Sequence, residues 1–269
     1  MWQGAVFFDY DGTLMDRDQG VSAPTAKSRD AIRQLKQNGY LAVLCTGRSL
    51  AYIPQDAKNL EFDGYITTNG AYGQMNGTEL FNQPLEEELV QSFQNACEQL
   101  RISYTLEGQK ECFYRAFSPL YDGWLKRFHI STESLLPMEQ RKHTAINKMM
   151  IVYDEEEQRN QLLKAFGNRL VFDQHIQYTS CDVSRRGTNK GTGVEQFLAH
   201  INLSPKQAYA IGDSDNDLEM IRIAGTGIAM EKHSERLGQS ADYITDSVAN
   251  DGVAKALAHF RLVRQPFLR

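Results

Sequence analysis

Short apolar runs alternate with helix-length polar segments at the start of this chain. The runs Ala5–Phe8, Tyr40–Cys45 and Tyr65–Thr68 predict buried strands, because a strand that is covered on both faces carries apolar residues continuously. A helix is predicted to begin at Pro24 and to end near Gly39. A strand–helix–strand spacing of about 30 residues is typical of βαβ units, which build parallel sheets.

The middle of the chain has a different pattern, in which strand-like runs follow one another in pairs. After a helix that carries Leu85, Leu89 and Phe93, a second helix is predicted at Asp154–Phe166 and strands are predicted at Arg101–Leu106, Cys112–Phe117, Lys148–Tyr153, Leu170–Phe172 and Ile176–Thr179. Paired strands with helices favour an α+β module over further βαβ units.

The alternation of strands and helices resumes after Gly187. The predicted elements are a helix at Gly191–His200, strands at Gln207–Ile211 and Gly227–Met230, and a closing helix marked by Val253, Leu257 and Phe260. We therefore expect an α/β fold in which residues 1–81 and 186–269 form one domain. A second domain, at residues 82–185, is expected to interrupt it.

The composition is that of an ordinary globular protein with one large or two modest domains. The 269 residues are 41% hydrophobic and 23% charged, with a formal net charge of -5, so the charge balance gives no indication of nucleic-acid binding. The four cysteines lack any CxxC pair, which indicates reduced thiols in a cytoplasmic protein. No run reaches the ~20 apolar residues of a membrane span, and no signal peptide is recognisable. We expect a cytoplasmic protein with neither a nucleic-acid nor a membrane partner.

Two carboxylates, Asp9 and Asp11, follow the first predicted strand, and Gly12 follows them. Side chains at i and i+2 of a strand share a face, so both acids leave the sheet together at its C-terminal edge, where open α/β sheets bind ligands. Adjacent carboxylates repel each other unless a cation or a proton lies between them. The pair therefore predicts a metal site or a shared proton, although Asp-Gly is also a common turn.

Three further polar clusters lie near the ends of predicted elements. Thr46-Gly47 offers a small hydroxyl and an uncovered backbone N–H to an anion, or forms a simple turn. Gly212–Asp217 holds three acids in five residues, which bind a cation or form an exposed acidic turn. An EF-hand does not fit, because Leu218 stands where that loop requires glycine. Lys190 precedes a predicted helix, where a solvated surface lysine is the ordinary case.

Together these clusters resemble the four motifs of the haloacid dehalogenase (HAD) superfamily, which is dominated by magnesium-dependent phosphatases. Asp9–Leu14 matches the DxDGTL first motif, Thr46 the second, Lys190 the third and Gly212–Asp217 the GDxxND fourth. Flanking segments resemble the Cof-type branch, namely Thr46-Gly47-Arg48, Thr68-Asn69-Gly70-Ala71, Ala224–Met230 and Asp251-Gly252-Val253. The resemblance covers nearly all of the chain outside the predicted insertion.

The position of the insertion refines the expected fold. The long interval between Thr46 and Lys190 leaves room for a whole domain. In the superfamily that the chain resembles, an α/β cap at this place defines class II, and its IIB form accompanies Cof-type proteins. The resemblance thus implies a Rossmann-like parallel-sheet HAD core with an inserted α+β cap of class IIB.

The resemblance also implies catalytic and metal-binding residues. Asp9 is expected to be the nucleophile that forms an aspartyl-phosphate, and Asp11 to protonate the leaving oxygen and then deprotonate water. The expected cofactor is Mg²⁺, which suits a site of carboxylate, carbonyl, water and phosphate oxygens. Its implied ligands are the Asp9 carboxylate, the Asp11 main-chain carbonyl and Asp213. Asp217 is expected to hold a metal-bound water or to orient Lys190, with direct ligation of the metal as an alternative.

Phosphate oxygens are expected to be bound by a further set of groups, namely Thr46, the Gly47 amide, Lys190, Asn216 and backbone amides from Tyr10 onward. Lys190 also offsets the crowding of acids, because an opposite charge within ~4–6 Å favours ionised carboxylates. Arg48 and Asn69 lie near the same sheet edge, where they face the cap or have a purely structural role.

The insertion carries a group of aromatic residues, Tyr114, Phe117, Tyr121, Trp124 and Phe128. They are expected to form its hydrophobic core, and the alternative is that one or two line a substrate pocket. The histidines show no HxH or HExxH spacing, so zinc is not expected.

We expect an enzyme, a phosphoric monoester hydrolase whose substrate is a small-molecule phosphate ester such as a sugar phosphate or a phosphorylated cofactor. A phosphosugar mutase is an alternative, because IIB-capped proteins that the chain resembles include phosphomannomutases. A non-catalytic phosphate-responsive regulator is a second alternative, although a pure binder needs no pair of nucleophile and acid. The protein is expected to be a monomer or a homodimer.

Overall fold

The structure, a computed structural model, describes residues 2–175 and 178–264. The chain divides into two compact units, which we describe separately. The core unit lies within Met1–Gly47, Ile53–Phe81 and Asn189–Arg269, and the cap unit comprises Arg48–Tyr52 and Asn82–Thr188. The four cysteines are buried and unpaired, as expected. Within the described ranges, no helix combines the length and the apolar character that are needed to cross a bilayer.

The core unit is built on an eight-stranded sheet. In order across the sheet, its strands are β14 (Tyr243–Ile244), β13 (Thr226–Ala229), β12 (Ala208–Gly212), β1 (Gly4–Phe8), β2 (Tyr40–Cys45), β3 (Gly64–Thr67), β4 (Tyr72–Met75) and β5 (Thr78–Asn82). The strands from β14 to β3 are parallel, and β4 runs antiparallel to β3. Ala5 of β1 pairs with Leu41 on one side and Ala208 on the other, so β1 is a central strand.

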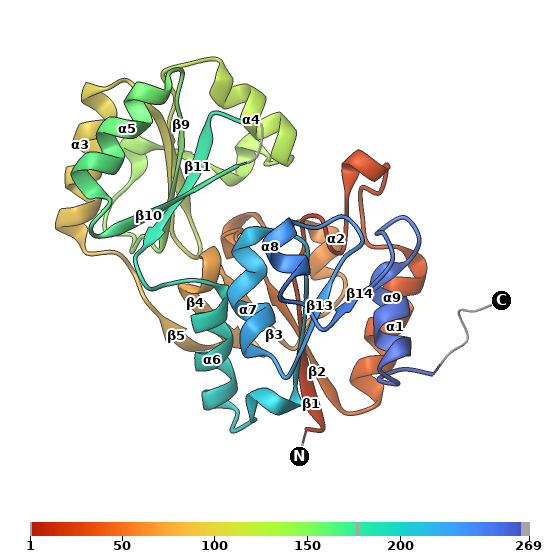
Figure 1. Ribbon diagram of the computed structural model, residues 1–269. Coiled ribbons are helices and arrows are strands. Elements are labelled where there is room, and N and C mark those ends of the chain that lie inside the picture. The colour runs from red at the N-terminus through yellow and green to blue at the C-terminus, as the bar shows by residue number, and fades with distance from the viewer. Residues whose placement is uncertain (1, 176–177, 265–269) are drawn as a thin grey trace. The chain divides into compact units, whose positions relative to one another are not determined.

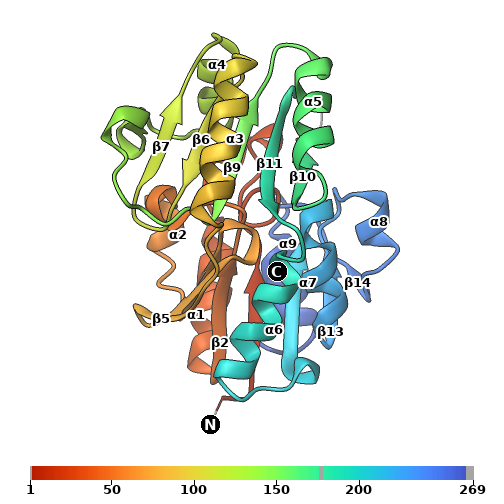
Figure 2. The same cartoon turned by 90° about the vertical axis from the view of Figure 1, so that its left-hand side faces the viewer.

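Helices cover both faces of the core sheet, as Figures 1 and 2 show. One face carries α1 (Ala26–Gln37) and α9 (Gly252–His259), and the other carries α6 (Lys190–His200) and α7 (Leu218–Ile223). The unit also contains the short helices α2 (Gln55–Lys58) and α8 (Glu235–Gly238) and the 3-10 turns η1 (Arg17–Gln19), η3 (Thr68–Gly70), η6 (Pro205–Gln207) and η7 (Asp215–Asp217). This double cover explains why β1 is apolar along its whole length, since all five of its residues are buried.

The predicted elements of the core unit are confirmed, including the full extent of β2. Thr25 begins α1 as predicted, because its hydroxyl accepts a hydrogen bond from the N–H of Ser28 at 3.2 Å. The prediction for the cap contained one error, the strand at Ile176–Thr179. Residues 176 and 177 lie outside the described residues, and Tyr178 and Thr179 are not in a strand. The strand is β11 (Ser180–Arg185), whose alternation of polar and apolar residues concealed it in a search for continuous apolar runs.

The cap unit contains a six-stranded sheet. The order of strands is β10 (Leu170–Gln174), β11, β9 (Lys148–Val152), β6 (Ser103–Glu107), β7 (Cys112–Arg115) and β8 (Leu136–Pro137). All neighbours are antiparallel except β7 and β8. Figures 1 and 2 show α3 (Glu87–Gln99) and α5 (Glu156–Phe166) on one face and α4 (Leu120–Phe128) on the other. The remaining 3-10 turns are η2 (Leu50–Tyr52), η4 (Thr132–Ser134) and η5 (Met138–Gln140).

Aromatic residues form much of the cap's hydrophobic core. Tyr121 and Trp124 of α4 are buried in one cluster, with Tyr114 and Phe128 packed against it. Phe117 packs against a separate cluster between the sheet and the helices α3 and α5. The prediction that these aromatic residues form the core of the insertion is therefore confirmed.

The two faces of the cap sheet differ in polarity. On β6, β9 and β11 alternate residues such as Leu106, Met149 and Val183 join the apolar cluster beneath α3 and α5. Because successive side chains of a strand point to opposite faces, the intervening residues lie on the other face. Among them are three charged residues, Glu107, Lys148 and Asp182, which are all buried.

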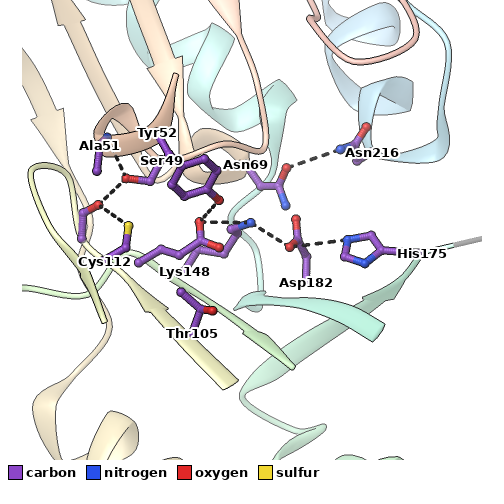
Figure 3. Close-up of polar contacts among 12 residues, drawn as sticks. Ser49, Ala51, Tyr52, Asn69, Thr105, Cys112, Lys148, His175, Asp182 and Asn216 are labelled. Carbon is purple, nitrogen blue, oxygen red and sulfur yellow. Dashed lines mark hydrogen bonds and ion pairs between the residues drawn. The ribbon is translucent and has the colours of Figure 1, made fainter. Parts of the chain in front are cut away.

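These three side chains form a buried ion-pair cluster, and Figure 3 shows its Lys148 and Asp182 side chains in contact. The Lys148 Nζ lies 2.7 Å from Asp182 Oδ1 and 3.2 Å from Glu107 Oε2. The Tyr52 hydroxyl donates to Glu107 Oε2 at 2.7 Å, and His175 Nε2 lies 3.6 Å from Asp182 Oδ1. The cluster thus joins three strands with the loop that carries Tyr52.

The two carboxylates of the cluster respond differently to the same lysine. Burial raises the pKa of Glu107, even though Lys148 acts in the opposite direction. Burial also acts to raise the pKa of Asp182, but Lys148 and His175 outweigh it and lower that pKa. Burial alone would lower the pKa of Lys148, whereas Asp182 and Glu107 raise it. The ammonium is therefore the charge that allows both carboxylates to be buried.

Residues 48–52 belong to the cap unit, although core segments flank them on both sides. The Ser49 hydroxyl donates to the carbonyl of Gly108, and Arg48 Nη2 donates to the carbonyl of Phe128 at 3.0 Å. Together with the bond from Tyr52 to Glu107, these contacts tie the segment to the cap sheet. The chain therefore enters the cap directly after Gly47 and returns to the core at Ile53.

Replacing Lys148 by Met tests the role of the buried ammonium. The variant leaves two buried carboxylates without their counter-charge, so we expect the free energy of unfolding of the cap to fall by about 3–5 kcal/mol. Denaturant titration followed by Trp124 fluorescence, in a Trp2→Phe background, measures it. Lys126→Met, at an exposed position of α4, is the matched control and should change the free energy by less than about 0.5 kcal/mol. Equal effects of the two substitutions would contradict the assignment.

Candidate active site

The carboxyl ends of three parallel strands bring the candidate residues to one edge of the core sheet. Asp9 follows β1, Thr46 follows β2 and Asp213 follows β12. The N–H of Asp9 donates to the carbonyl of Ile211 at 3.0 Å, which fixes the end of β1 against β12. Motifs that are far apart in the sequence are therefore neighbours at the edge where open α/β sheets bind ligands.

A buried ammonium group joins two carboxylates at this edge. The Lys190 Nζ donates to Asp9 Oδ1 and to Asp217 Oδ1, each at 2.6 Å. All three side chains are buried, and Lys190 is only 1% exposed. Lys190 is thus the counter-charge of the site and not a solvated surface lysine.

The start of α6 holds Lys190 in place. Asn189 caps the helix, because its Oδ1 accepts a hydrogen bond from the N–H of Thr192 at 2.9 Å. The Thr192 hydroxyl accepts in return from the N–H of Asn189 at 3.0 Å. This reciprocal capping box makes Lys190 the first residue of the helix, so its ammonium is carried by a rigid element.

Asp217 uses both of its carboxylate oxygens within the site. One oxygen contacts Lys190, and the other accepts hydrogen bonds from the N–H groups of Asp213 and Ser214 at 3.0 and 3.1 Å. Of the roles that the sequence left open for Asp217, these contacts support the orientation of Lys190. The same contacts also shape the loop that carries Asp213.

Asp213 completes a cluster of three carboxylates. One oxygen of each of Asp9, Asp213 and Asp217 lies within 4.8 Å of the other two. The Thr13 hydroxyl donates to Asp213 Oδ1 at 3.2 Å. Gly12 has a φ of +91°, and a Cβ at this position would lie 2.3 Å from Asp213 Oδ2. Glycine is therefore required for the turn after β1 to approach Asp213.

The cluster carries more negative charge than one ammonium neutralises. Burial and then the charge of Asp217 raise the pKa of Asp9 from 3.8 to about 7, although Lys190 acts in the opposite direction. Burial, Asp9 and Asp217 raise the pKa of Asp213 well above its ordinary value. Burial alone would lower the pKa of Lys190, but Asp217 and Asp9 outweigh it and raise that pKa. The carboxyl groups therefore compete for positive charge.

A divalent cation fits this charge balance. Crowded carboxylates repel one another unless a proton or a cation lies between them, and carboxylate oxygens are preferred ligands of hard cations such as Mg²⁺. Both oxygens of Asp217 already accept hydrogen bonds from Lys190 and from main-chain amides. Asp9 and Asp213 are therefore the better-placed carboxylates for holding a metal ion.

The turn after β1 carries Tyr10 and Asp11 beside the cluster. Asp11 is half-buried, pairs with Met15 through an isolated bridge, and contributes to the raised pKa of Asp9. The Tyr10 side chain is buried, and its hydroxyl donates to Asp56 Oδ2 at 2.7 Å. The Asp56 contact was not anticipated from the sequence, because nothing local marks Asp56 as a partner of Tyr10.

The candidate phosphate-binding groups Thr46, Gly47 and Asn216 lie at the ends of β2 and β12. Thr46 is buried, and Gly47 directly follows it. Asn216 lies in η7, where its Oδ1 accepts a hydrogen bond from the Ser214 hydroxyl at 2.8 Å. All three belong to the core unit, as do Lys190 and Tyr10.

A left-handed turn after β3 is a part of the site to which the sequence analysis gave no definite role. Thr68, Asn69 and Gly70 have φ values of +51°, +54° and +91°. This conformation is unusual for a β-branched residue such as Thr68 and costs about 1–3 kcal/mol. Asn69 Oδ1 accepts a hydrogen bond from Asn216 Nδ2 at 3.5 Å, as Figure 3 shows. The Asn-Gly dipeptide was the available signal, because both residues tolerate left-handed backbone.

Comparison with known proteins gives the family to which these residues point. The model of the haloacid dehalogenase-like hydrolase family matches residues 6–257. A 5-amino-6-(5-phospho-D-ribitylamino)uracil phosphatase of Bacillus subtilis is 27% identical, with 96% of this chain and 95% of the relative covered. A phosphoglycolate phosphatase of Archaeoglobus fulgidus is 29% identical, with 97% and 98% covered. A Streptococcus pyogenes protein named as a bifunctional phosphatase and peptidyl-prolyl cis-trans isomerase is 29% identical, but the chain spans 54% of its length.

Solved structures confirm the predicted fold. A sugar phosphatase of HAD subclass IIB has a TM-score of 0.83 at 24% identity, with 97% of this chain and 100% of that one covered. A HAD phosphatase from Bacteroides thetaiotaomicron has a TM-score of 0.82 at 25% identity, with 97% and 96% covered. The parallel-sheet core with an inserted class IIB cap is thus the fold of this chain. The match of family, fold and clustered motifs shows that the chain belongs to the haloacid dehalogenase-like hydrolases, as an enzyme of their phosphatase branch.

Proposed function

We propose that this enzyme is a Mg²⁺-dependent phosphatase that hydrolyses small-molecule phosphomonoesters through an aspartyl-phosphate on Asp9. The observation that carries the proposal is the position of the Lys190 Nζ, 2.6 Å from the Asp9 carboxylate in a buried site. The lysine favours the anionic form of Asp9, which is the form that attacks phosphorus. It also supplies positive charge where the phosphoryl group must bind.

In the first step, an Asp9 carboxylate oxygen attacks phosphorus and the bond between phosphorus and the ester oxygen breaks. The leaving oxygen takes its proton from Asp11, which therefore begins the step protonated. The phosphoryl group is then bound to Asp9 as a mixed anhydride. Charge on its oxygens is stabilised by the groups proposed to bind phosphate, which are Tyr10 (through its amide), Thr46, Gly47, Lys190 and Asn216.

In the second step, water attacks phosphorus and the bond between phosphorus and Asp9 breaks. Asp11, now ionised, takes the proton of the attacking water. Inorganic phosphate leaves, and both Asp9 and Asp11 return to their starting states. Two easier displacements thereby replace one direct hydrolysis.

The Asp9 carboxylate, the Asp11 main-chain carbonyl and Asp213 would hold Mg²⁺, which when bound neutralises charge on the transferring phosphoryl group. The excess negative charge of the cluster supports this assignment, because burial raises the pKa values of both Asp9 and Asp213. Asp217 supports the arrangement by holding Lys190 and the loop after β12.

The proposed substrates are sugar phosphates or phosphorylated cofactors. Two relatives match this chain over nearly their full length. One is named for a phosphorylated ribityl compound and the other for phosphoglycolate, and both compounds are small molecules. The buried, unpaired cysteines are typical of a reducing compartment, which supports a cytoplasmic location.

A phosphate-release screen of the purified enzyme against a panel of small phosphomonoesters tests the proposal. We expect inorganic phosphate to be released in the presence of Mg²⁺ and release to stop when a chelator is added. Asp9→Asn removes the nucleophile and should lower kcat by about three orders of magnitude or more. Glu88→Gln, at an exposed position of α3, is the control and should leave kcat unchanged.

The same screen separates the alternatives. Conversion of one hexose phosphate into another without phosphate release would identify a mutase. Phosphate binding without any turnover across the panel would indicate a regulator.

Asp11→Asn tests the proposed acid and base. The amide cannot donate or accept the proton of the reaction, so we expect kcat to fall by about 10²–10⁴-fold. Metal binding should change little, because the proposed contact of Asp11 with the metal uses its main-chain carbonyl. Calorimetric titration with Mg²⁺ measures the second quantity. Unaltered turnover would remove Asp11 from the mechanism.

Metal binding should depend on pH with a definite sign. Without a cation, the folded chain holds a proton on Asp9 up to a pKa of about 7, compared with 3.8 in the unfolded chain. The contribution of Asp9 to stability therefore falls as the pH rises from about 4 through about 7, and a bound cation replaces the lost proton. We expect Mg²⁺ to raise the melting temperature more at pH 8 than at pH 5.5.

Differential scanning fluorimetry with and without Mg²⁺ measures this difference. A free Mg²⁺ concentration of about 100 times Kd stabilises the folded chain by about 2.7 kcal/mol. The Asp213→Asn variant should show a much smaller Mg²⁺ effect at pH 8. A larger effect at pH 5.5 than at pH 8 would contradict the proposed carboxylate site.

A further inference from the structure

We propose that Asn69 is a positioning residue that holds Asn216, and through it the phosphate-binding end of the site, in its working orientation. The inference rests on the proposed function and adds a residue to its machinery. It comes from the left-handed turn after β3, formed by Thr68, Asn69 and Gly70. The turn lies in the core unit, as do Thr46, Asn189 and Asn216.

The conformation of the turn is the first observation. Three consecutive residues have positive φ values, and one of them is Thr68, whose branched side chain disfavours this region. Thr67, Thr68 and Asn69 are buried, with exposed fractions of 0, 0 and 3%. The hydroxyls of Thr67 and Thr68 have no hydrogen-bond partner among the described residues. Neither hydroxyl therefore stabilises the turn, and it must be held by its neighbours.

Two of those neighbours are proposed phosphate-binding residues. The Asn69 N–H donates to the main-chain carbonyl of Thr46 at 3.3 Å. The Asn69 side chain accepts from Asn216 Nδ2 at 3.5 Å, and the Ser214 hydroxyl donates to the other side of the same amide, at Asn216 Oδ1. Both polar atoms of the Asn216 amide are thus engaged, which limits its rotation.

The third neighbour is the start of the helix that carries Lys190. A Cβ added to Gly70 would lie 2.0 Å from the carbonyl oxygen of Asn189, and one added to Gly193 would lie 2.8 Å from the Cα of Gly70. Two glycines therefore allow the turn and α6 to pack backbone against backbone. The turn contacts the segments of Thr46, Lys190 and Asn216, and so it links three of the proposed phosphate-binding groups.

A simpler explanation is that asparagine occupies position 69 only because it tolerates left-handed backbone. Asn69→Gly separates the two explanations, because glycine adopts this backbone without strain but has no amide to hold Asn216. The matched control is Asn202→Gly. Asn202 has the same φ of +54° but lies exposed after α6.

Calorimetric binding of inorganic phosphate in the presence of Mg²⁺ is the primary measurement, with the melting temperature as the check on folding. We expect Asn69→Gly to weaken phosphate binding about 5–10-fold, in line with the loss of one hydrogen bond. We expect its melting temperature to stay close to that of the wild type. Asn202→Gly should leave phosphate affinity unchanged.

A double-mutant cycle with Asn216→Ala shows whether Asn69 acts through Asn216. If it does, Asn69→Gly should weaken phosphate binding little further in a chain that already lacks the Asn216 amide. Full additivity, or wild-type phosphate affinity in Asn69→Gly, would overturn the proposal. A wild-type chain that binds no phosphate would overturn it as well.

The outcome is distinguishable from failure of the proposed function. A chain that binds phosphate and shows the expected coupling, but releases no phosphate from any ester, would remove the phosphatase proposal and leave the role of Asn69 intact. A chain that hydrolyses esters but shows no coupling between Asn69 and Asn216 would leave the phosphatase proposal intact and remove the proposed role of Asn69.

Discussion

The Lys190 ammonium has almost no contact with solvent, and it lies between two carboxylates that would otherwise repel each other more strongly. Asp9 and Asp217 each lie 2.6 Å from its nitrogen, and either one left alone would carry the full penalty of a buried charge. Lys190 begins α6, Asp9 follows β1 and Asp217 precedes α7. The two ion pairs of one ammonium therefore fix three segments of the core unit relative to one another.

The site has more carboxylates than ammonium groups, and this excess of negative charge is the basis of the proposed metal binding. Asp213 adds a third carboxylate to the cluster, and burial together with the charge of Asp217 raises the pKa values of Asp9 and Asp213. The cap contains a related arrangement, in which Lys148 lies between Glu107 and Asp182. There, among the described residues, two carboxylates share one ammonium, and Tyr52 and His175 also contact them. The core cluster thus has three carboxylates for one ammonium, which favours binding of a cation, whereas the cap cluster has two carboxylates for one ammonium.

Close approach of backbone segments is the second constraint on the site. Gly12 lets the turn after β1 meet Asp213, and Gly70 lets the turn after β3 meet the start of α6. At both places a Cβ would clash with the neighbouring segment. The strained conformation of Thr68 belongs to the same arrangement, because unusual backbone is tolerated where the surroundings determine it.

The sequence by itself located most strands of the core sheet and named the candidate residues of the site. Continuous apolar runs located β1, β2 and β3, and the resemblance to the four family motifs pointed to the acids and the lysine, because these signals are local. The sequence was less informative on β11, where a polar face breaks the apolar pattern, and on Arg48–Tyr52, which pairs with residues far along the chain.

Only the tertiary structure decided which acids lie together. The residue pattern alone does not distinguish the three acids of Gly212–Asp217, although the family resemblance does. In the structure Asp217 contacts Lys190, Asp213 joins the carboxylate cluster, and Asp215 is exposed and contacts Ser234. It also decided that Lys190 is buried and that Asn69 meets Asn216. Such pairings depend on chain segments that fold together from distant positions, and burial, which sets the strength of each charge, arises only when they do.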